Sequence, residues 1–286
     1  MIQKYTFHQR GVQALAFSIN AQHLISVGVQ GENNLAIWDL QSGLVVRSCL
    51  IRNTTAVNAI AVDPYVNTGE HIQFTIVGNQ GLFNIYRFEI ANQMLQCYEV
   101  EDIAPEFKNS DFTSVSFSNI LNNQGLYQIF LGANDGSMQA YDPNANQFHE
   151  ACIKKWVISG EIGHSRSNNH TLVVASSSGS ICRFNISLVH MFPQDNKQVT
   201  LFRADGPVVS LAMDELNNEG IVGTSYGTMY YINFNDKLMI KMVNKPYSVQ
   251  KPITQVKFEE SNPQLIISNV CCSDGNGSGI VKVWTS

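Results

Sequence analysis

Short apolar runs separated by polar, glycine-containing turns recur along nearly the whole chain. In the first 50 residues these runs cover 11–18, 23–28, 34–40 and 44–50. They are rich in Val, Ile, Leu and aromatic residues, and their length between turn residues is typical of strands rather than helices. The opening segment therefore predicts four short antiparallel strands in one sheet.

The same unit can be counted six times. Each copy has a glycine in the turn before its third strand, where a tight hairpin favours the one residue that takes a positive φ without steric cost. The residues near the end of the third strand are Trp38, Tyr86, Tyr141, Phe184, Ile232 and Trp284, and the turn glycines are Gly31, Gly81, Gly136, Gly179, Gly227 and Gly279. First strands of the later copies are predicted at 57–62, 112–117, 155–159, 208–213 and 253–258.

Repeats of about 40 to 50 residues with four short strands each are typical of small sheets stacked radially into a β-propeller. The last copy stops at its third strand, 280–284, and an unmatched strand at 2–7 precedes the first copy. We expect residues 2–7 to add the missing outer strand to the last blade, which would leave no edge there unpaired. The prediction is an all-β fold, a single closed propeller over residues 1–286 with four-stranded antiparallel blades. Six blades are counted, and a seventh would have to lie in 101–111 or 187–203.

The dipeptide Trp38–Asp39 and its variant Tyr141–Asp142 resemble the signature of the WD-repeat family. The resemblance covers essentially the whole chain. It implies a Gly-His pair before the first strand and an Asp in the hairpin turn, which form a buried hydrogen-bonded tetrad in strong WD blades. Asp135 and Asp274 are kept, but Gly163–His164 falls just after a predicted first strand. The resemblance therefore implies an incomplete tetrad in most blades, whose rigidity then comes mainly from packing.

The first repeat, 11–28 with 35–40, also resembles propellers of microtubule- and cilium-associated WD proteins, the echinoderm microtubule-associated protein-like group and related centriolar and axonemal proteins. That resemblance implies a non-catalytic scaffold that binds other proteins, among them axonemal or microtubule-associated proteins, in the cytoplasm at a cilium or the cytoskeleton. Because tubulin's outer surface is acidic, a chain with a net charge of -5 is expected to dock through other proteins. The alternative is a general WD-repeat adaptor subunit of a ubiquitin-ligase or trafficking complex.

The charge balance argues against nucleic acid as a partner. Lys and Arg number 18 against 23 for Asp and Glu, and no dense basic run is present. The best candidate for a local basic patch is 237–251, where solvated lysines are the simpler interpretation. No run approaches the roughly 18 apolar residues of a membrane-spanning helix, so no membrane insertion is expected. The six cysteines are scattered, and reduced thiols are expected.

Motifs that suggest chemistry have simpler structural interpretations. Gly223–Gly227 fits the Gly-x-Ser-x-Gly pattern of hydrolases, but that motif requires a helix to follow, and here a strand is predicted instead. The seven histidines lack metal-ligand spacing. Asp274–Gly279 lacks the bidentate Glu of a calcium loop. We therefore expect no catalytic residues, no metal, no cofactor and no enzymatic activity.

The functional surface of a propeller is the ring of loops on its narrow face. These loops join fourth to first strands and second to third strands. Arg and Tyr anchor protein interfaces out of proportion to their number, and they guide the choice of partner-binding candidates. The candidates are Arg10, Gln30, Arg52, Asn79, Asn134, Arg203, Asp205, Tyr226, Tyr247 and Lys251.

Overall fold

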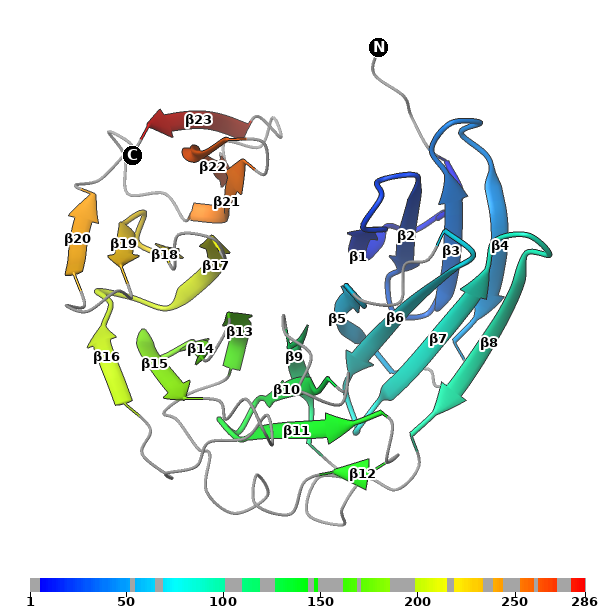
Figure 1. The fold of residues 1–286 in the computed structure, drawn as a ribbon, viewed down its shortest axis with the longest axis horizontal. Helices are drawn as coiled ribbons and strands as arrows, with labels where there is room; N and C mark the ends of the chain where they lie inside the picture. The colour runs from blue at the N-terminus through cyan, green and yellow to red at the C-terminus, as the bar shows by residue number, and fades with distance from the viewer. Residues whose placement is uncertain are drawn as a thin grey trace. The chain divides into compact units, whose positions relative to one another are not determined.

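The regular elements that the structure describes are all β-strands (Figure 1). It is a computed structural model. It describes residues 6–51, 55–64, 69–100, 110–118, 127–143, 147–148, 162–168, 171–185, 199–214, 219–233, 239–243, 253–259, 262–271 and 279–285. The all-β prediction is confirmed for these residues.

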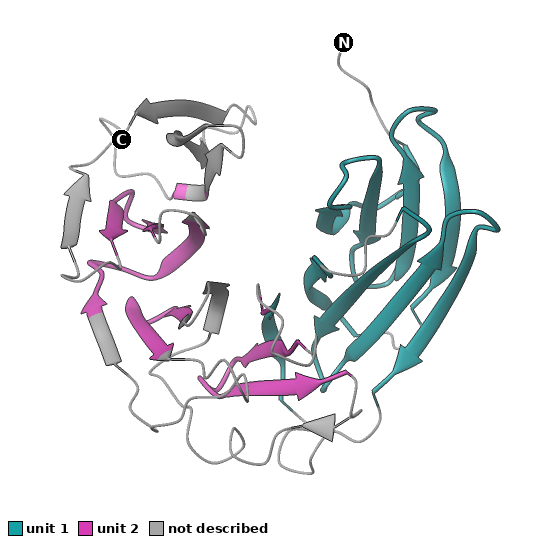
Figure 2. Cartoon of the chain, in the orientation of Figure 1, with its two compact units in different colours: residues 1–117 teal, residues 118–286 magenta. Residues whose placement is uncertain are grey.

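The chain divides into two compact units, residues 1–117 and residues 118–286 (Figure 2). The first unit contains two four-stranded antiparallel sheets in which strands adjacent in sequence are adjacent in the sheet, followed by β9. Its strands are β1 (Val12–Phe17), β2 (His23–Gly28), β3 (Asn34–Asp39), β4 (Val45–Leu50), β5 (Val57–Val62), β6 (His71–Gly78), β7 (Phe83–Glu89), β8 (Met94–Glu99) and β9 (Phe112–Phe117). The expectation of one domain over residues 1–286 stays a prediction.

The second unit repeats the same up-and-down order. Its sheets include β13–β14–β15–β16, β17–β18–β19–β20 and β21–β22–β23, preceded by the paired strands β10, β11 and β12. The strands are β10 (Ile129–Ala133), β11 (Met138–Asp142), β12 (Gln147–Phe148), β13 (Ile162–Asn168), β14 (Thr171–Ser176), β15 (Ser180–Asn185), β16 (Val199–Arg203), β17 (Val208–Asp214), β18 (Glu219–Thr224), β19 (Met229–Asn233), β20 (Met239–Val243), β21 (Ile253–Glu259), β22 (Asn262–Cys271) and β23 (Gly279–Thr285).

Neighbouring sheets within each unit bury their apolar faces against one another. In the first unit, Ile25 and Ile37 of the β1–β4 sheet share one core cluster with Phe74 and Tyr86 of the β5–β8 sheet. In the second unit, Val173 and other residues of the β13–β16 sheet pack with the β17–β20 sheet. Burying each such side chain contributes about 1.5–3 kcal/mol. The first strands β1, β5 and β9 lie next to one another in the first unit, as β13, β17 and β21 do in the second.

The residues that define each repeat, the third-strand residue and the turn glycine, are confirmed where the structure describes them. The third-strand positions from Trp38 to Ile232 lie on β3, β7, β11, β15 and β19 and are at most 4% exposed. The turn glycines from Gly31 to Gly227 have φ between 72° and 89°. Gly279 differs, because it is the first residue of β23 and pairs with Cys271.

The fourth repeat was predicted least well. Its expected first strand, 155–159, lies outside the described residues, and the strand that pairs with β14 is β13. The sequence of β13, IGHSRSN, is polar and lacks the apolar pattern on which the prediction relied. Gly163–His164 therefore lies inside a strand, rather than after one.

Closure of the propeller by the N-terminal strand stays a prediction. Residues 1–5 lie outside the described part of the chain, and Thr6 and Phe7 are not in a strand. The last sheet has the three described strands β21, β22 and β23. Phe7 contacts the first sheet instead, edge-on to Trp38 with ring centroids 6.1 Å apart. Of the segments considered for a seventh blade, 101–109 and 187–198 lie outside the described residues, and 199–203 forms β16.

Candidate functional site: the loop edges of the sheets

A repeated backbone contact ties the second-to-third-strand turn to the segment before the first strand. The N–H of Val29 donates to the carbonyl of Gly11 at 3.1 Å, and the N–H of Ser225 donates to the carbonyl of Pro207 at 2.9 Å. The second sheet has the same bond, from Asn79 to the carbonyl of Ala56. In these three sheets, both kinds of loop therefore meet at the same end of the strands, which we call the loop edge.

Three of the predicted partner-binding residues lie at this edge in the first unit. Arg10 and Gln30 are exposed, and a Cβ at Gly31, the residue after Gln30, would lie 2.9 Å from an Arg10 Nη atom. Asn79 is half-buried, and its side-chain oxygen accepts a hydrogen bond from Asn58 at 2.7 Å. The structure thus brings Arg10 close to the turn that carries Gln30, while Asn79 is held in a separate turn.

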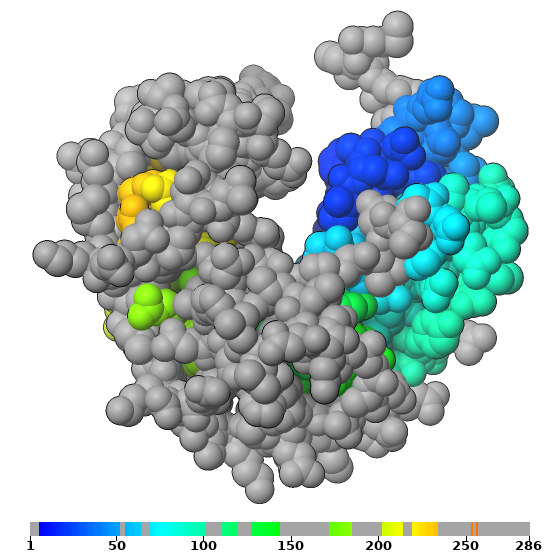
Figure 3. All heavy atoms as spheres, in the orientation of Figure 1, coloured from blue at the N-terminus to red at the C-terminus, as the bar shows by residue number. Residues whose placement is uncertain are grey.

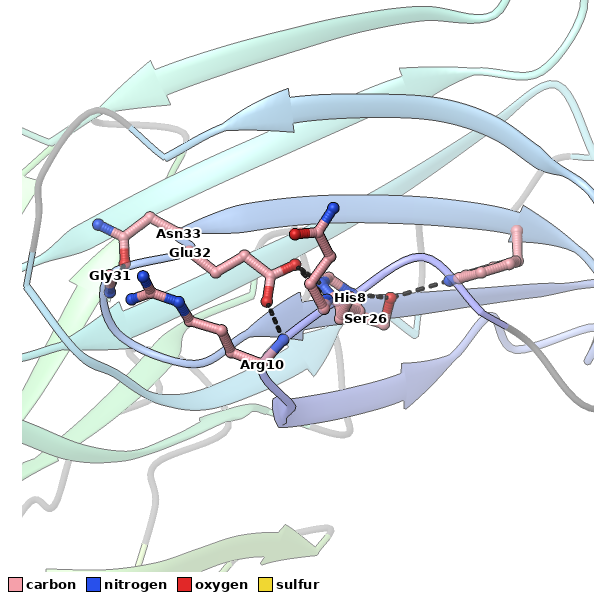
Figure 4. A network of polar contacts seen from close by, with 8 residues as sticks. His8, Arg10, Ser26, Gly31, Glu32 and Asn33 are labelled. Carbon is pink, nitrogen blue, oxygen red and sulfur yellow. Dashed lines mark hydrogen bonds and ion pairs between the residues drawn. The ribbon is translucent and has the colours of Figure 1, made fainter.

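Beneath Arg10, a chain of polar side chains runs into the first sheet (Figure 4). The Trp38 indole Nε1–H donates to the Ser26 hydroxyl at 2.8 Å, and the same hydroxyl lies 2.8 Å from His8 Nε2. His8 Nδ1 lies 3.3 Å from a Glu32 carboxylate oxygen. With His8 donating Nδ1–H to Glu32 and accepting the Ser26 O–H, all four groups are paired. This is the buried tetrad of the WD resemblance, with Glu32 in place of the expected Asp and without a Gly before His8.

The Glu32 carboxylate is held mainly by backbone donors. Its oxygens accept the N–H of Arg10 and the N–H of Gln9, both at 3.1 Å. The Arg10 N–H is the largest cause of a lowered pKa for this carboxyl, followed among the lowering causes by the Gln9 N–H and by His8. The network therefore fastens the segment before β1 to the β2–β3 turn.

The order Ser26–His8–Glu32 matches the order of a hydrolase triad, but its environment does not suit catalysis. Ser26 is 2% exposed and the His8 side chain 3% exposed. One lone pair of the Ser26 hydroxyl already accepts the Trp38 N–H. A nucleophile needs a reachable hydroxyl beside the site of the reacting carbon. We therefore interpret this network as structural.

A different cluster occupies the same edge of the β17–β20 sheet in the second unit. The Asp205 carboxylate accepts hydrogen bonds from the hydroxyls of Thr224 and Thr228, and the Asp205 N–H donates to the Tyr230 hydroxyl at 3.1 Å. Burial is the largest cause of a raised pKa for Tyr230. The ring of Tyr226 covers Gly206, where a Cβ would lie 2.7 Å from the ring. Of the predicted residues, Asp205 and Tyr226 are thus brought together.

The remaining predicted residues fall in three places. Arg203 is exposed at the end of β16, and its Nε–H donates to the carbonyl of Ser178 at 3.2 Å. Asn134 is exposed in the β10–β11 turn. Arg52, Tyr247 and Lys251 lie outside the described residues.

The chemical motifs of the sequence behave as structural elements where they are described. Gly223–Gly227 forms the end of β18 and the turn into β19, so a strand follows and no nucleophile elbow is formed. Among the described side chains, no three His, Cys, Asp or Glu residues are grouped to hold a metal ion. No helix in the described part of the chain is long and apolar enough to cross a membrane.

Sequence reasoning missed His8 and Glu32 as partners, and also the roles of Thr228 and Tyr230. The family pattern has a Gly-His pair, whereas His8 follows Phe7. A weaker rule would have found the pair: a His shortly before a first strand and any carboxylate in the next hairpin turn. For Asp205, the sequence indicated only a position in a loop between strands and did not indicate its hydrogen-bond partners.

Comparisons with known proteins agree with this fold. The chain is 23% identical over 291 residues to WD repeat-containing protein 90 of Mus musculus, and 24% identical over 254 residues to the protein of that name from Xenopus tropicalis. These matches cover 97% and 84% of this chain, which spans only 14% and 13% of the length of the two relatives. No family model matches the sequence.

Solved propellers superpose on nearly the whole chain. The β-propeller domain of Myceliophteria thermophila Cps50 (Swd1) gives a TM-score of 0.71 at 16% identity, over 99% of this chain and 85% of that domain. The WD40 repeats of RRP9 give 0.68 at 13% identity, over 98% of this chain and 78% of the other. At these identities the likeness shows the fold, which is the propeller fold expected from the repeats.

Proposed function

We propose that this chain, a β-propeller of the WD-repeat type, is a non-catalytic scaffold that binds other proteins through the loop edges of its sheets. One observation carries the proposal. At these edges the polar groups that could perform chemistry are tied into internal networks, while Tyr226 is 56% exposed and Arg203 and Arg10 are also exposed. Exposed Tyr and Arg on loops held by backbone bonds are suited to anchor a partner.

The finer proposal is that the assembly is microtubule-associated, in a cilium or centriole. It is supported by the resemblance of the first repeat to propellers of that group. With a net charge of -5, contact with the microtubule is proposed to run through other proteins. The proposed location is the cytoplasm, at the cilium or cytoskeleton. The chain spans about one seventh of the matched relatives, so a place within a longer multi-propeller protein fits the same proposal.

The test is localisation and co-purification of the tagged chain from ciliated cells, with loop variants compared to a matched control. Tyr226→Ala and Arg203→Ala are expected to reduce recovery of the partners. Leu44→Ala is the control, because Leu44 is 65% exposed but lies between β3 and β4, at the opposite end of the strands from the loop edge. Enrichment of axonemal or centriolar proteins supports the finer proposal. Enrichment of ubiquitin-ligase or trafficking subunits without a ciliary signal would favour the adaptor and contradict it.

A further inference from the structure

A pocket of about 490 Å³ opens in the first unit between the outer strands of its two sheets. β4 and β8 each stand last in their sheet order and contribute six of the seven lining residues, while Tyr86 on β7 contributes the seventh. β8 lies on the molecular surface (turquoise in Figure 3). The lining comprises Arg47, Cys49, Leu50, Tyr86, Leu95, Cys97 and Glu99. The pocket thus combines two thiols, two opposite charges and apolar walls.

Cys97 is the more accessible of the two thiols in the pocket. It is exposed, and its sulfur is hydrogen-bonded to the hydroxyl of Tyr86, which is itself 2% exposed. Burial is the main cause of a raised pKa for Tyr86, so the phenol stays protonated at neutral pH. Asn84 donates to the Tyr86 oxygen at 3.4 Å. The hydrogen bond with Cys97 is a further cause of the raised pKa of Tyr86, which is the direction expected when the phenol donates to the sulfur. A hydrogen bond donated to sulfur stabilises the thiolate, the nucleophilic form.

Cys49 differs from Cys97 in the same pocket. It is half-buried, and burial is the largest cause that raises the pKa of its thiol to about 11. It therefore remains protonated at neutral pH and is a poor nucleophile. The pocket therefore holds one thiol suited to nucleophilic attack, Cys97, and one that is not, Cys49.

The charges flank the thiols along the strands. Arg47 lies two residues before Cys49 on β4, and Glu99 lies two residues after Cys97 on β8. Arg47 is exposed and can bind a carboxylate in a bidentate manner, and a carboxylate such as Glu99 can bind an ammonium group. Glutathione is a thiol peptide that carries both groups, and its size suits a pocket of this volume. We propose that this pocket is a thiol–disulfide exchange site, at which Cys97 takes up a glutathione-type peptide as a mixed disulfide.

The exchange needs no reagent beyond the disulfide itself. The Cys97 thiolate attacks one sulfur of glutathione disulfide, the S–S bond of glutathione disulfide breaks, and a Cys97–glutathione S–S bond forms. The departing glutathione thiolate takes up one proton from water, which replaces the proton that Cys97 released. This modification is independent of the proposed scaffold function, because none of the partner-binding candidates lines the pocket.

The test is incubation of the folded chain with glutathione disulfide, followed by intact-mass measurement and peptide mapping. One glutathionyl group on Cys97 is expected in the wild type and in Cys49→Ser, and none at that position in Cys97→Ser. Tyr86→Phe retains the ring and removes the donated proton. We expect it to slow the exchange several-fold and to move the rate-against-pH profile to higher pH.

Two further measurements distinguish the site from a merely exposed thiol. Arg47→Gln is expected to slow exchange with glutathione disulfide more than exchange with uncharged hydroxyethyl disulfide. Equal slowing with both reagents would overturn the role of the charge. Modification of other cysteines in place of Cys97, a Cys49–Cys97 disulfide without glutathione, or an unchanged pH profile in Tyr86→Phe would overturn the proposal.

Discussion

The β1–β4 sheet and the β17–β20 sheet each hold their loops together at the equivalent end of the strands, but they do so with different residues. In both, a backbone N–H of the hairpin turn donates to the carbonyl just before the first strand. In the first sheet, side-chain bonds continue from Glu32 through the interior to Trp38. In the other sheet, the Asp205 carboxylate binds two threonine hydroxyls at the loop edge, and among the described residues no side-chain hydrogen bond continues to the third-strand position, Ile232.

The residue type at equivalent strand positions explains the difference. Ser26 pairs with Leu15 on β1 and with Ala36 on β3, and the matching position in the β17–β20 sheet is Val222. Without a hydroxyl at that position, an indole could not be linked to a loop residue. Ser26 and Trp38 together therefore couple the loop edge to the core in the first sheet, which should be more sensitive to polar substitutions in its interior.

The largest expected effect is that of Trp38→Ala. The indole is 4% exposed, packs with Leu24 and Ala36, and supplies the inner end of the network. Its removal should lower the free energy of unfolding by about 3–5 kcal/mol, measured by urea denaturation with circular dichroism. Leu44→Ala, at a side chain that is 65% exposed, is the control and should change it by less than about 0.5 kcal/mol. A loss below about 1 kcal/mol for Trp38→Ala would contradict the assigned core role.

Ser26→Ala should have the next largest effect. It removes a small hydroxyl but leaves the Trp38 N–H and His8 Nε2 without their partner in the interior. The free energy of unfolding should fall by about 2 kcal/mol. Denaturation of Ser26→Ala, Trp38→Phe and the double variant forms a cycle. The two losses should be non-additive, because both variants break the same bond. Strict additivity would show that the indole and the hydroxyl do not act together.

Asp205→Ala should lower the free energy of unfolding by less, about 1 kcal/mol, although it removes a charged acceptor. Asp205 is exposed, so water can replace its carboxylate as the acceptor for the hydroxyls of Thr224 and Thr228. Thr224 Oγ1 also accepts the N–H of Thr228 at 3.2 Å. Thermal or urea unfolding checks the ranking. A loss for Asp205→Ala above that for Ser26→Ala would reverse the proposed order of the two sheets.

The smallest expected effect is a pH dependence specific to the first sheet. The pKa of Glu32 is lowered, so this carboxyl stabilises the fold above its ordinary value of 4.5, and the contribution is lost as pH falls below that value. Glu32→Gln should therefore be less stable than the wild type at neutral pH, and the difference should shrink in acid. Urea midpoints measured from pH 7 to pH 3 check this. A constant difference across that range would show that the carboxylate charge is not what holds Arg10.

The strands could be predicted where apolar residues alternate with turns, and the loop networks could not. The predicted strands at 57–62 and 112–117 coincide with β5 and β9, because their side chains fit a half-buried strand and turn residues bound them. β13 failed this rule, since it is polar and its place is set by pairing with β14. Pairing is a tertiary property that a local pattern does not contain.

The candidate site shows the same limit. Exposure of Arg10, Gln30, Asn134, Arg203 and Tyr226 could be predicted from their positions in loops. The partners of His8 could not, because Ser26 and Glu32 come close to it only when the segment before β1 lies against β2 and the β2–β3 turn. Loop exposure is a local property, whereas a hydrogen-bond network depends on register.

The central claim is that the internal networks hold the fold while the exposed loop side chains bind the partner. The most direct test measures partner recovery and the free energy of unfolding for the same two variants, Tyr226→Ala and Ser26→Ala, at a temperature where both are folded. The account predicts that Tyr226→Ala loses the partner with little change in stability, and that Ser26→Ala loses stability and keeps the partner. Full recovery with Tyr226→Ala, together with loss of the partner in a stable Ser26→Ala, would contradict it.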